Sequence, residues 1–572
     1  MKKGYKGGIK YSASTLLLVT IVLILLNIIG SFVHGFIDLT GDKRFTLTKV
    51  TKELVTEVDE VVYVRVLLEG EFPAGFKRLR AATEQLLREF RSINSNIQYE
   101  FEDPTEGDAE TIKGRRDQLA KIGVVPTALK YFDGKEFVQK AIYPHAIVSK
   151  GGKTEVVYLL EEQLPGMDEQ LVLNNSVSLL EYKFASAIQR LSLERKLNIA
   201  FTTGHSELEP KQTVKLEREL RKFYNTGRLN LDSLVYIDER LDLLIVAGAK
   251  KPMSLKNQFK IDQYLMNGGR VIWLVETMDA SLDSIAKYKF YVPRDYELGF
   301  DQLLFKYGVR IQPNLLLDLE CTAIPQIVGM SGDKPQTMMF PWYYHPVITP
   351  DNDHPIVKNI SPVNMYFPST LDTVSTHGNV KKTILLRSSK YSRVQFNPVR
   401  LNFEVLKEAP DPSKFTKSHQ AVAILLEGEF QSAFKNRVSD DFRKTLSEIN
   451  MEFKESGVGT KQLVVSDADF VKNLVNPRTE EYEEIGFNKW ELKYFKGNKD
   501  FMLNAIEYML DNRGLLESRT REVKLRLLDA VKVRSERKYW QILNIAAPIL
   551  ILILFGLLFT WYRRFRFGKR MV

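Results

Sequence analysis

Two long uncharged stretches lie near the ends of the chain. Residues 13–36 carry no charged side chain, and residues 16–29 are almost all Leu, Ile and Val. Residues 542–562 are equally free of charge, and the aromatic residues that bracket them are Tyr539, Trp540, Trp561 and Tyr562. A helix of about 20 apolar residues spans a bilayer, and Trp and Tyr favour the headgroup level. The pattern therefore predicts transmembrane helices at residues 13–36 and 542–562.

The first of these stretches has a second interpretation. A basic start followed by an apolar run is also typical of a cleaved signal peptide. This run is long for a signal peptide, and no A-x-A-like cleavage site follows it. We therefore expect the helix to be retained.

Residues 37–195 have the pattern of a small α/β domain. Strands are predicted at 61–68, 97–101 and 124–131, helices at 76–93 and 173–191, a polar helix that ends near Lys121, and a hairpin at 137–160 that turns at Gly151-Gly152. This order, βαβαβ followed by a hairpin and a helix, resembles a thioredoxin-like domain. The Pro-Thr pair before the third strand resembles that fold's loop, so we expect a cis bond at Val125–Pro126. The position of a redox motif reads Glu69-Gly70-Glu71-Phe72-Pro73 without cysteine, which excludes redox chemistry there.

Residues 196–514 alternate apolar strands with amphipathic helices. The predicted strands are 197–202, 241–246 and 271–275, and strands at 421–426 and 462–465 are expected to complete the same sheet. Continuous apolar strands between helices indicate a parallel sheet covered on both faces, so we expect the open doubly wound class. Residues 310–410 are rich in proline and aromatic residues with little periodicity, and we expect an irregular insertion there. Residues 515–541 predict a charged helical stalk that enters the second span directly.

Composition and charge limit the classes of function that the chain can have. The chain has 572 residues, of which 44% are hydrophobic and 27% charged, as expected of a folded multidomain protein. Of the net charge of +10, four lysines in residues 1–12 and five basic residues in residues 563–572 leave about +1 for the body. A nucleic-acid footprint is therefore excluded. Because basic residues stay on the cytoplasmic side, we expect both tails in the cytoplasm and the body in the periplasm, attached to the inner membrane.

One loop after a predicted parallel strand is a candidate ligand site. Gly204, His205, Ser206 and Glu207 precede a helix, at the sheet edge where open α/β sheets bind ligands. His205 could bind an anion together with the helix N-terminus. Capping of the helix by Ser206 or Glu207 is the alternative, and we expect it to explain these residues.

Other candidate residues have ordinary explanations as well. Asp467 and Asp469 also follow a strand, and they could act as paired acid and base or cap a helix. His345 and His354, with Asp351 and Asp353 between them, match no zinc spacing, so we expect loop residues and no metal. Cys321 is the single cysteine, so an internal disulfide is impossible. The residues around it do not form the Gly-flanked turn that exposes a nucleophile in this fold class.

Gly151-Gly152-Lys153-Thr154 lacks the first glycine of a phosphate loop. We therefore expect no directly bound ATP and no cofactor.

Several segments resemble one known family. They begin with Asp38-Leu39-Thr40 and Lys43-Arg44-Phe45-Thr46-Leu47-Thr48 after the first span, and continue with 75–77, 261–270, 354–357, 497–501 and 523–529. Together they resemble the GldG family of gliding-motility-associated ABC transporter auxiliary proteins. The resemblance implies a two-span inner-membrane protein that associates with a permease and a separate ATPase. It also implies that the second domain is similar to a class I glutamine amidotransferase fold without its catalytic cysteine.

Three hypotheses of function follow. In the first, the chain is a non-catalytic extracytoplasmic subunit of an ABC-type complex involved in gliding motility. In the second, it is a solute-binding module with a pocket near Gly204, His205 and Glu207. In the third, it is a hydrolase-like enzyme that uses Asp467 and Asp469. A ligand-sized cleft with convergent polar groups would favour the second hypothesis over the first.

Overall fold

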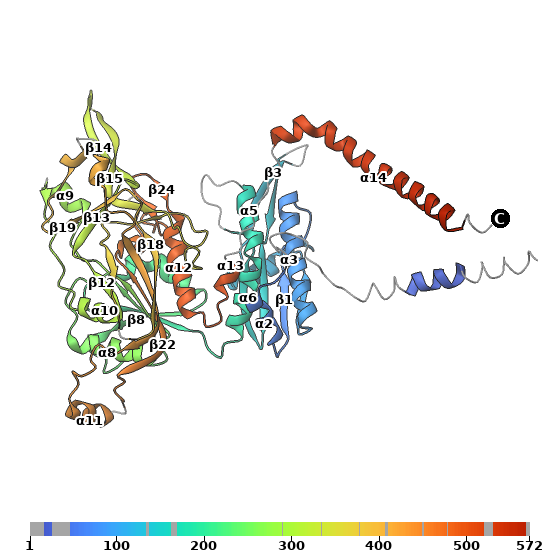
Figure 1. Cartoon of the computed structure of the whole chain (residues 1–572). Helices are drawn as coiled ribbons and strands as arrows, with labels where there is room; N and C mark the ends of the chain where they lie inside the picture. Colours follow the sequence, from blue (N-terminus) through green and yellow to red (C-terminus); the bar gives the residue numbers. More distant parts are fainter. Residues whose placement is uncertain are drawn as a thin grey trace, which may run out of the picture. The chain divides into compact units, whose positions relative to one another are not determined.

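The computed structural model describes most of the chain. The described residues are 16–25, 46–132, 137–161, 169–288, 290–332, 334–376, 378–406, 410–448, 451–476, 479–519 and 530–567. Their contacts divide the chain into two units, Met1–Arg521 and Glu522–Val572. The fold is mixed α/β with several sheets (Figure 1).

The first α/β region is built on a sheet of strand order β2-β1-β5-β6. β1 (Val62–Val66) is parallel to β2 (Ile97–Phe101) and antiparallel to β5 (His145–Lys150), which pairs with β6 (Lys153–Tyr158) around the Gly151-Gly152 turn. The helices of this region are α2 (Lys49–Thr56), α3 (Ala74–Ile93), α4 (Ala109–Lys121), α5 (Glu169–Ser178) and α6 (Leu180–Leu191).

Burial alternates along β1, and this pattern shows which face of the sheet packs against the helices. Val62, Val64 and Val66 are fully buried, whereas the residues between them are not. The three valines share one core with apolar residues of α3 and α6. Since successive side chains of a strand point to opposite faces, one face of the sheet is fixed against these helices.

The segment before β5 differs from the sequence-based prediction. The strands β3 (Thr127–Phe132) and β4 (Phe137–Ile142) pair only with each other, as a separate antiparallel two-stranded sheet, and β3 does not add a strand to the main sheet. The prediction of a cis bond at Val125–Pro126 is wrong: among the described residues the cis bond is Asn397–Pro398. The Pro-Thr pair leads into this side hairpin and not into a strand of the main sheet, as the resemblance had implied.

The second α/β region contains a nine-stranded sheet within the described residues. The parallel strands β8 (Asn225–Asn230), β7 (Asn198–Thr203), β9 (Leu243–Ala247), β10 (Val271–Leu274) and β22 (Ser456–Val465) lie side by side in that order. The antiparallel strands β21 (Ala421–Gln431), β17 (Leu371–Thr373), β12 (Val309–Ile311) and β18 (Val380–Arg387) continue it. Strands 421–426 and 462–465 thus join the same sheet, as predicted, but the sheet is mixed and not wholly parallel.

Helices cover both faces of this sheet. On one face, Leu243 and Ile245 of β9 share a core with α7 (Pro210–Arg221) and α12 (Lys496–Leu510). On the other face, Leu244 and Val246 share a core with α8 (Leu255–Met266) and α10 (Asp301–Tyr307). Every residue of β9 is buried, which explains its continuous apolar run.

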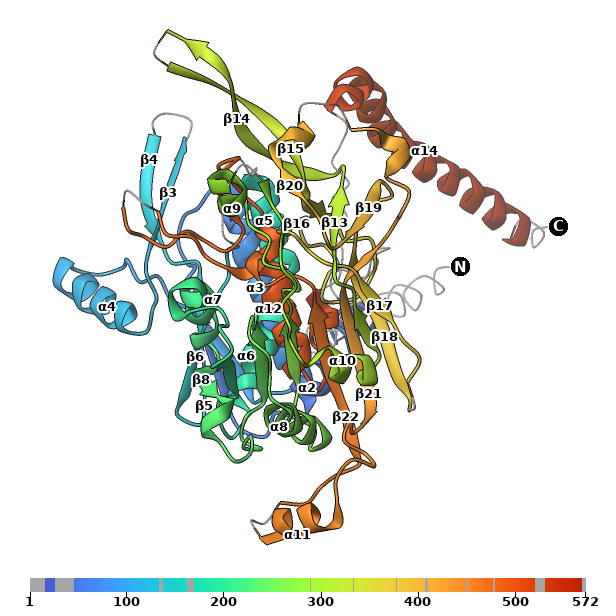
Figure 2. The ribbon, with the colours of Figure 1, turned by 90° about the vertical axis from the view of Figure 1, so that its left-hand side faces the viewer.

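The expectation of an irregular insertion at residues 310–410 is wrong. Short strands fill it: β13 (Asn314–Asp318), β16 (Val363–Asn364), β19 (Ser392–Phe396) and β20 (Leu401–Asn402), of which β20 pairs with β11 (Phe290–Tyr291) after α9 (Leu282–Tyr288). Two longer strands of this segment, β14 (Cys321–Ser331) and β15 (Lys334–Ile348), form a hairpin that extends beyond the sheet in both views (Figures 1 and 2). The remaining elements are α11 (Asp440–Glu448), β23 (Phe487–Asn488) and β24 (Lys493–Tyr494).

The predicted stalk is only partly within the described residues. α13 (Leu516–Arg519) begins it, and Leu515 and Leu516 are each 1% exposed, so its start is buried in the body. α14 (Ala530–Phe567) is continuous through Pro548. Its segment Tyr539–Phe565, with a mean hydropathy of 2.7, is the one described helix long and apolar enough to cross a membrane. Of the predicted first span, the structure describes a shorter apolar helix, Leu16–Leu25.

Candidate functional site

The loop after β7 brings His205 and Glu207 together. His205 is 4% exposed, and its Nδ1 lies 3.4 Å from Oε1 of Glu207, whose Oε2 accepts a hydrogen bond of 2.6 Å from the His205 backbone N–H. Nε2 of His205 lies 3.4 Å from Nδ2 of Asn257, which donates to Asp232. Ser206 is exposed. Glu207 of the same loop and Asn257 of α8 therefore lie at the two ring nitrogens of His205.

The pKa shifts of this pair favour the protonated form of His205 and the ionised form of Glu207. Glu207, as hydrogen-bond acceptor, raises the pKa of His205 above its ordinary value despite burial. Burial alone would raise the pKa of Glu207, but hydrogen bonds from the His205 side chain and from backbone N–H groups lower it. The two shifts support each other, as expected of an internal ion pair.

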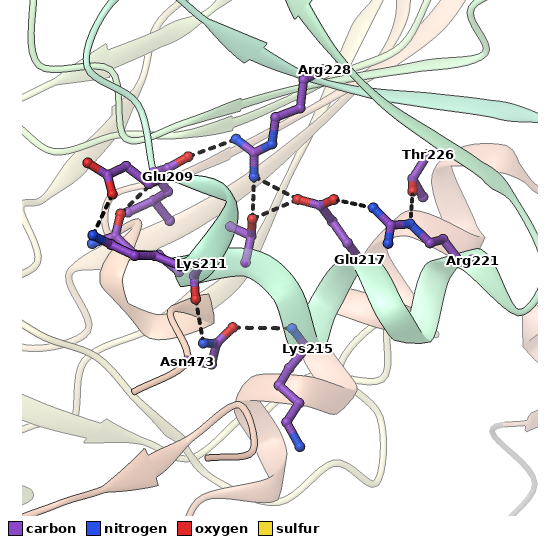
Figure 3. A network of polar contacts seen from close by, with 11 residues as sticks. Glu209, Lys211, Lys215, Glu217, Arg221, Thr226, Arg228 and Asn473 are labelled. Carbon is purple, nitrogen blue, oxygen red and sulfur yellow. Dashed lines mark hydrogen bonds and ion pairs between the residues drawn. The ribbon is translucent and has the colours of Figure 1, made fainter. Parts of the chain in front are cut away.

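The helix after this loop is not capped by Ser206 or Glu207, so that prediction is wrong. α7 begins at Pro210 with Glu209 at the N-cap position, and the Gln212 side chain accepts a hydrogen bond of 2.8 Å from the Glu209 backbone N–H. The carboxylate of Glu209 lies 2.8 Å from Nζ of Lys211 (Figure 3). A carboxylate thus already stands at the helix N-terminus where the sequence predicted an anion.

A polar network fixes α7 to its neighbours. Arg228 of β8 donates to the backbone oxygen of Leu208 and to Glu217, and Glu217 also accepts from Arg221 (Figure 3). Asn473, far away in sequence, donates to the backbone oxygen of Lys211. These contacts hold the helix start in place, which is a structural role.

A cluster of carboxylates lies where β10 and β22 end. Glu276 follows β10, and its Oε1 accepts hydrogen bonds from the backbone N–H groups of Ala468 and Asp469, at 2.8 and 3.3 Å. Asp467 follows β22 and accepts from the N–H groups of Asp469 and Tyr366, both at 2.7 Å. The Asp467 side chain therefore stabilises the turn that leads into η4 (Asp469–Val471), whose N-cap residue, Ala468, makes no side-chain capping hydrogen bond.

Burial favours the protonated forms of Glu276 and Asp467. It raises the pKa of Glu276 to about 8, with the charge of Asp469 adding to the effect. Burial and the charge of Glu276 raise the pKa of Asp467 as well. Sequence analysis missed Glu276, although a glutamate directly after an apolar strand is the signal that could have revealed it, because β10 and β22 are neighbouring parallel strands.

A cavity of about 190 Å³ adjoins the cluster. Its polar and aromatic lining includes His345, Tyr366, Asp469, Lys472, Lys489 and Trp490. His345 is 2% exposed, and its ring makes edge-on contacts with the rings of Tyr366 and Phe367, each at 4.9 Å between centroids. The structure thus brings His345 and Asp469 to one cavity, which sequence analysis treated as unrelated candidates.

The other members of the predicted histidine and aspartate group each have a different partner. Nδ1 of His354 accepts a hydrogen bond from the Ile356 backbone N–H, Asp351 pairs with Arg387, and Asp353 with Lys358. Within the described residues no group of three or more His, Cys, Asp or Glu side chains is placed to hold a metal ion.

Cys321 is not an activated nucleophile. Burial raises the pKa of its thiol to about 12, so the thiol stays protonated at neutral pH.

Comparisons with known proteins place the second α/β region in a family. Residues 196–505 match the family of the ABC-type uncharacterized transport system auxiliary domain. The chain belongs to this family. Residues 41–149 match a further family, described as a domain of unknown function (DUF7088).

The known relatives add little about chemistry. An uncharacterized protein of Borreliella burgdorferi is 24% identical over 449 residues, covering 77% of this chain and 82% of the relative. A solved structure, the mmIFT52 N-terminal domain, is 12% identical, covers 55% of this chain and 96% of its own, and has a TM-score of 0.30, too low to define a shared fold. Family membership gives the chain an accessory, non-catalytic role in a transporter, and Tyr539–Phe565 is consistent with membrane association.

Proposed function

We propose that the chain is a doubly anchored, extracytoplasmic subunit of an ABC-type complex in the inner membrane. A separate permease and a separate cytoplasmic ATPase supply the transport path and the energy. The observation that carries the proposal is the family match over residues 196–505, joined to the apolar segment Tyr539–Phe565. Both tails lie in the cytoplasm and the α/β regions in the periplasm, as the basic residues at 1–12 and 563–572 favour.

The candidate chemistry supports a non-catalytic role. A raised pKa leaves Glu276 mostly protonated at neutral pH, and the Cys321 thiol is protonated too. His205 and Glu207 satisfy each other inside their loop. None of these groups is poised as a nucleophile or as a free base, so motion driven by the partner ATPase is the function we assign to the body.

The finer assignments rest on the sequence resemblance. Involvement in gliding motility is one of them. Another is a thioredoxin-like fold for residues 37–195, which the strand order β2-β1-β5-β6 supports. A third is a glutamine-amidotransferase-like fold for residues 196–514, which a sheet covered by helices on both faces supports.

Cysteine labelling tests the topology. In a C321S background, K256C introduces a single thiol at an exposed position of α8, and K569C introduces one in the carboxyl tail, on the other side of the membrane in the proposed topology. A membrane-impermeant maleimide is expected to label K256C in intact spheroplasts and K569C only after permeabilisation. Labelling of K256C only after permeabilisation would place the body in the cytoplasm and end the proposal.

Co-purification tests the partners. Extraction in mild detergent is expected to bring down a permease and an ATPase subunit with the full chain. The chain eluting alone, while its labelling pattern is as expected, would remove the transporter assignment and leave the topology intact.

A further inference from the structure

A cavity of about 750 Å³ lies between the first α/β region and the second, within the unit Met1–Arg521. One wall is β6, with Ile122 and Gly123 beside it, and the other wall is formed by residues 193–197 and 222–224. Binding pockets commonly have volumes of about 300–1,000 Å³ and often lie where domains meet. The size and place of this cavity are therefore those of a binding site, and the transporter role does not assign one here.

The cavity runs along the free edge of β6. β6 is the last strand in the order β2-β1-β5-β6, so among the described strands it pairs with β5 alone. Lys153, Thr154, Glu155 and Val156 are consecutive, and all of them line the cavity. Successive side chains of a strand point to opposite faces. A cavity that touches four consecutive residues therefore lies along the edge of the strand and not over one face.

Two residues of β6 turn their backbone groups toward this edge. The backbone oxygen of His145 accepts a hydrogen bond from the Leu67 N–H, so it points away from its β6 partner, Tyr158. In an antiparallel pair this direction alternates from residue to residue, so Val156 and Thr154 also turn their N–H and C=O groups away from β5. No hydrogen bond to these four groups occurs among the described residues. They are therefore free to pair with an added strand.

Two contacts join the walls and make the cavity a groove. The guanidinium carbon of Arg190 lies 4.4 Å from the centroid of the Phe223 ring, and Nζ of Lys222 lies 5.6 Å from the centroid of the Tyr158 ring. Each contact links the first α/β region to the second. β6 has six residues, and strands are usually about 5–6 residues long. The groove therefore offers a strand-length edge with a second wall opposite it.

The lining of the groove is basic. Five of its charged side chains are Lys or Arg, and two are Glu. Arg190 is neutralised within the lining by Glu155, at 2.8 Å from Nε to Oε1, and two other cations pair with carboxylates outside it. Lys153 and Lys196 form no ion pair with a described residue, and Glu194 is the second acidic side chain of the lining. Positive charge is therefore in excess along the edge of β6.

We propose that this groove binds an extended acidic segment of a partner protein, which adds to β6 as a further strand. Thr154 and Val156 exchange backbone hydrogen bonds with this segment, and Lys153 and Lys196 bind its carboxylates. Edge-to-edge pairing of two copies of the chain through β6 is disfavoured, because both edges carry the same positive charge. The binding does not depend on which transporter subunits accompany the chain.

Peptide titration tests this binding mode on the purified full-length chain in detergent. Fluorescein-labelled EVEVEVE, a heptapeptide of alternating glutamate and valine, is titrated at pH 7 by fluorescence anisotropy, beside KVKVKVK and EVEPEVE. EVEVEVE is expected to bind at least about 10-fold more tightly than either, because KVKVKVK has the wrong charge and EVEPEVE lacks a backbone N–H in its centre.

Three results would overturn the binding mode. One is the absence of either preference, and another is no binding of EVEVEVE up to about 1 mM. The third is displacement of EVEVEVE by inorganic phosphate or free glutamate at the concentration of the peptide, which would indicate a site for small anions.

Two variants locate the site, and a third serves as control. T154P removes an outward backbone N–H at an edge where proline is tolerated, so it is expected to keep its circular dichroism spectrum and to bind EVEVEVE at least about 10-fold more weakly. K196E, at an exposed position, is expected to weaken EVEVEVE about 5-fold and to strengthen KVKVKVK. K256E, exposed on α8 and outside the lining, is expected to change neither. Folded T154P and K196E proteins that bind EVEVEVE as tightly as the parent chain would overturn the site.

Discussion

Tyr182 and Glu507, 325 residues apart in the chain, are joined by a hydrogen bond from the phenol hydroxyl to the carboxylate. Tyr182 lies on α6 of the first α/β region and Glu507 on α12 of the second. Burial, together with the charge of Glu507, raises the pKa of Tyr182 well above its ordinary value, so the phenol remains a donor. The bond ties the two regions within the unit Met1–Arg521.

Removing this hydroxyl tests how strongly the regions are coupled. Y182F leaves the Glu507 carboxylate without its phenol donor, and we expect the free energy of unfolding to fall by about 2 kcal/mol. Thermal or urea unfolding in detergent measures it. Y236F, at an exposed tyrosine, is the control and is expected to change nothing measurable. Equal stability of Y182F and Y236F would show that the bond contributes nothing.

Close packing of the chain at Gly497 gives a second prediction. A Cβ there would lie 2.1 Å from the backbone oxygen of Ser361 and 2.4 Å from that of Pro362. Main chain would have to move, so G497A is expected to destabilise by about 3 kcal/mol. Gly114 in α4 has no heavy atom within 4 Å of the equivalent position, and G114A is expected to stabilise by about 0.5–1 kcal/mol. In the same denaturation experiment, the unfolding free energy is expected to fall for G497A and to rise for G114A.

Asp262 of α8 gives a third prediction because it is fully buried and accepts four hydrogen bonds. The donors are the Tyr307 hydroxyl, the Ser432 hydroxyl, the Ala433 backbone N–H and the Gln263 side-chain amide. D262A removes the acceptor of all four donors, although the Gln263 amide keeps its hydrogen bond to the Lys454 backbone oxygen, so we expect a loss of about 2–4 kcal/mol in unfolding free energy.

D117A, on the exposed side of α4, is the matched control for D262A. It is expected to stay within about 0.5 kcal/mol of the parent chain. Equal unfolding free energies for D262A and D117A would mean that the buried carboxylate is dispensable for stability.

The central sheet could be predicted from sequence because its strands are buried on both faces. Such burial leaves an unbroken apolar run, as at Val271–Leu274, which a short window detects. The β14–β15 hairpin escaped this reasoning because prolines interrupt it. Pro341 pairs with Ala323 and Pro335 with Met330 in a hairpin whose outer edges are largely unpaired, where a missing N–H costs little.

Similar local sequences also form different structures in two places of this chain. Residues 67–77 and 425–435 agree at eight of eleven positions, and both Gly70 and Gly428 have positive φ. The first segment follows the end of β1 and leads into α3, whereas the second continues inside β21. Neighbouring strands, and not the shared letters, decide which structure forms.

The candidate site shows the same limit. Sequence analysis singled out Asp467, Asp469 and His345 separately, because each stands out by type or by its place after a strand. Asp467 and Asp469 lie near Glu276 because β22 and β10 are neighbouring strands, and Asp469 and His345 line one cavity. Contacts between distant segments of the chain set this arrangement. Periodicity within a short window carries no information about such contacts.

The protonated carboxylate of Glu276 makes stability depend on pH. Its pKa of about 8 exceeds the ordinary value of 4.5, so the folded chain holds a proton that the unfolded chain releases over this range. Its contribution to stability is therefore complete below about pH 4.5 and is lost as pH rises to about 8. E276Q keeps the oxygen that accepts from Ala468 but cannot titrate, so its unfolding temperature is expected to fall less between pH 5 and pH 8. E297Q, at an exposed site, should retain the parent slope. Parallel slopes for all three proteins would show that Glu276 is ionised in the folded chain.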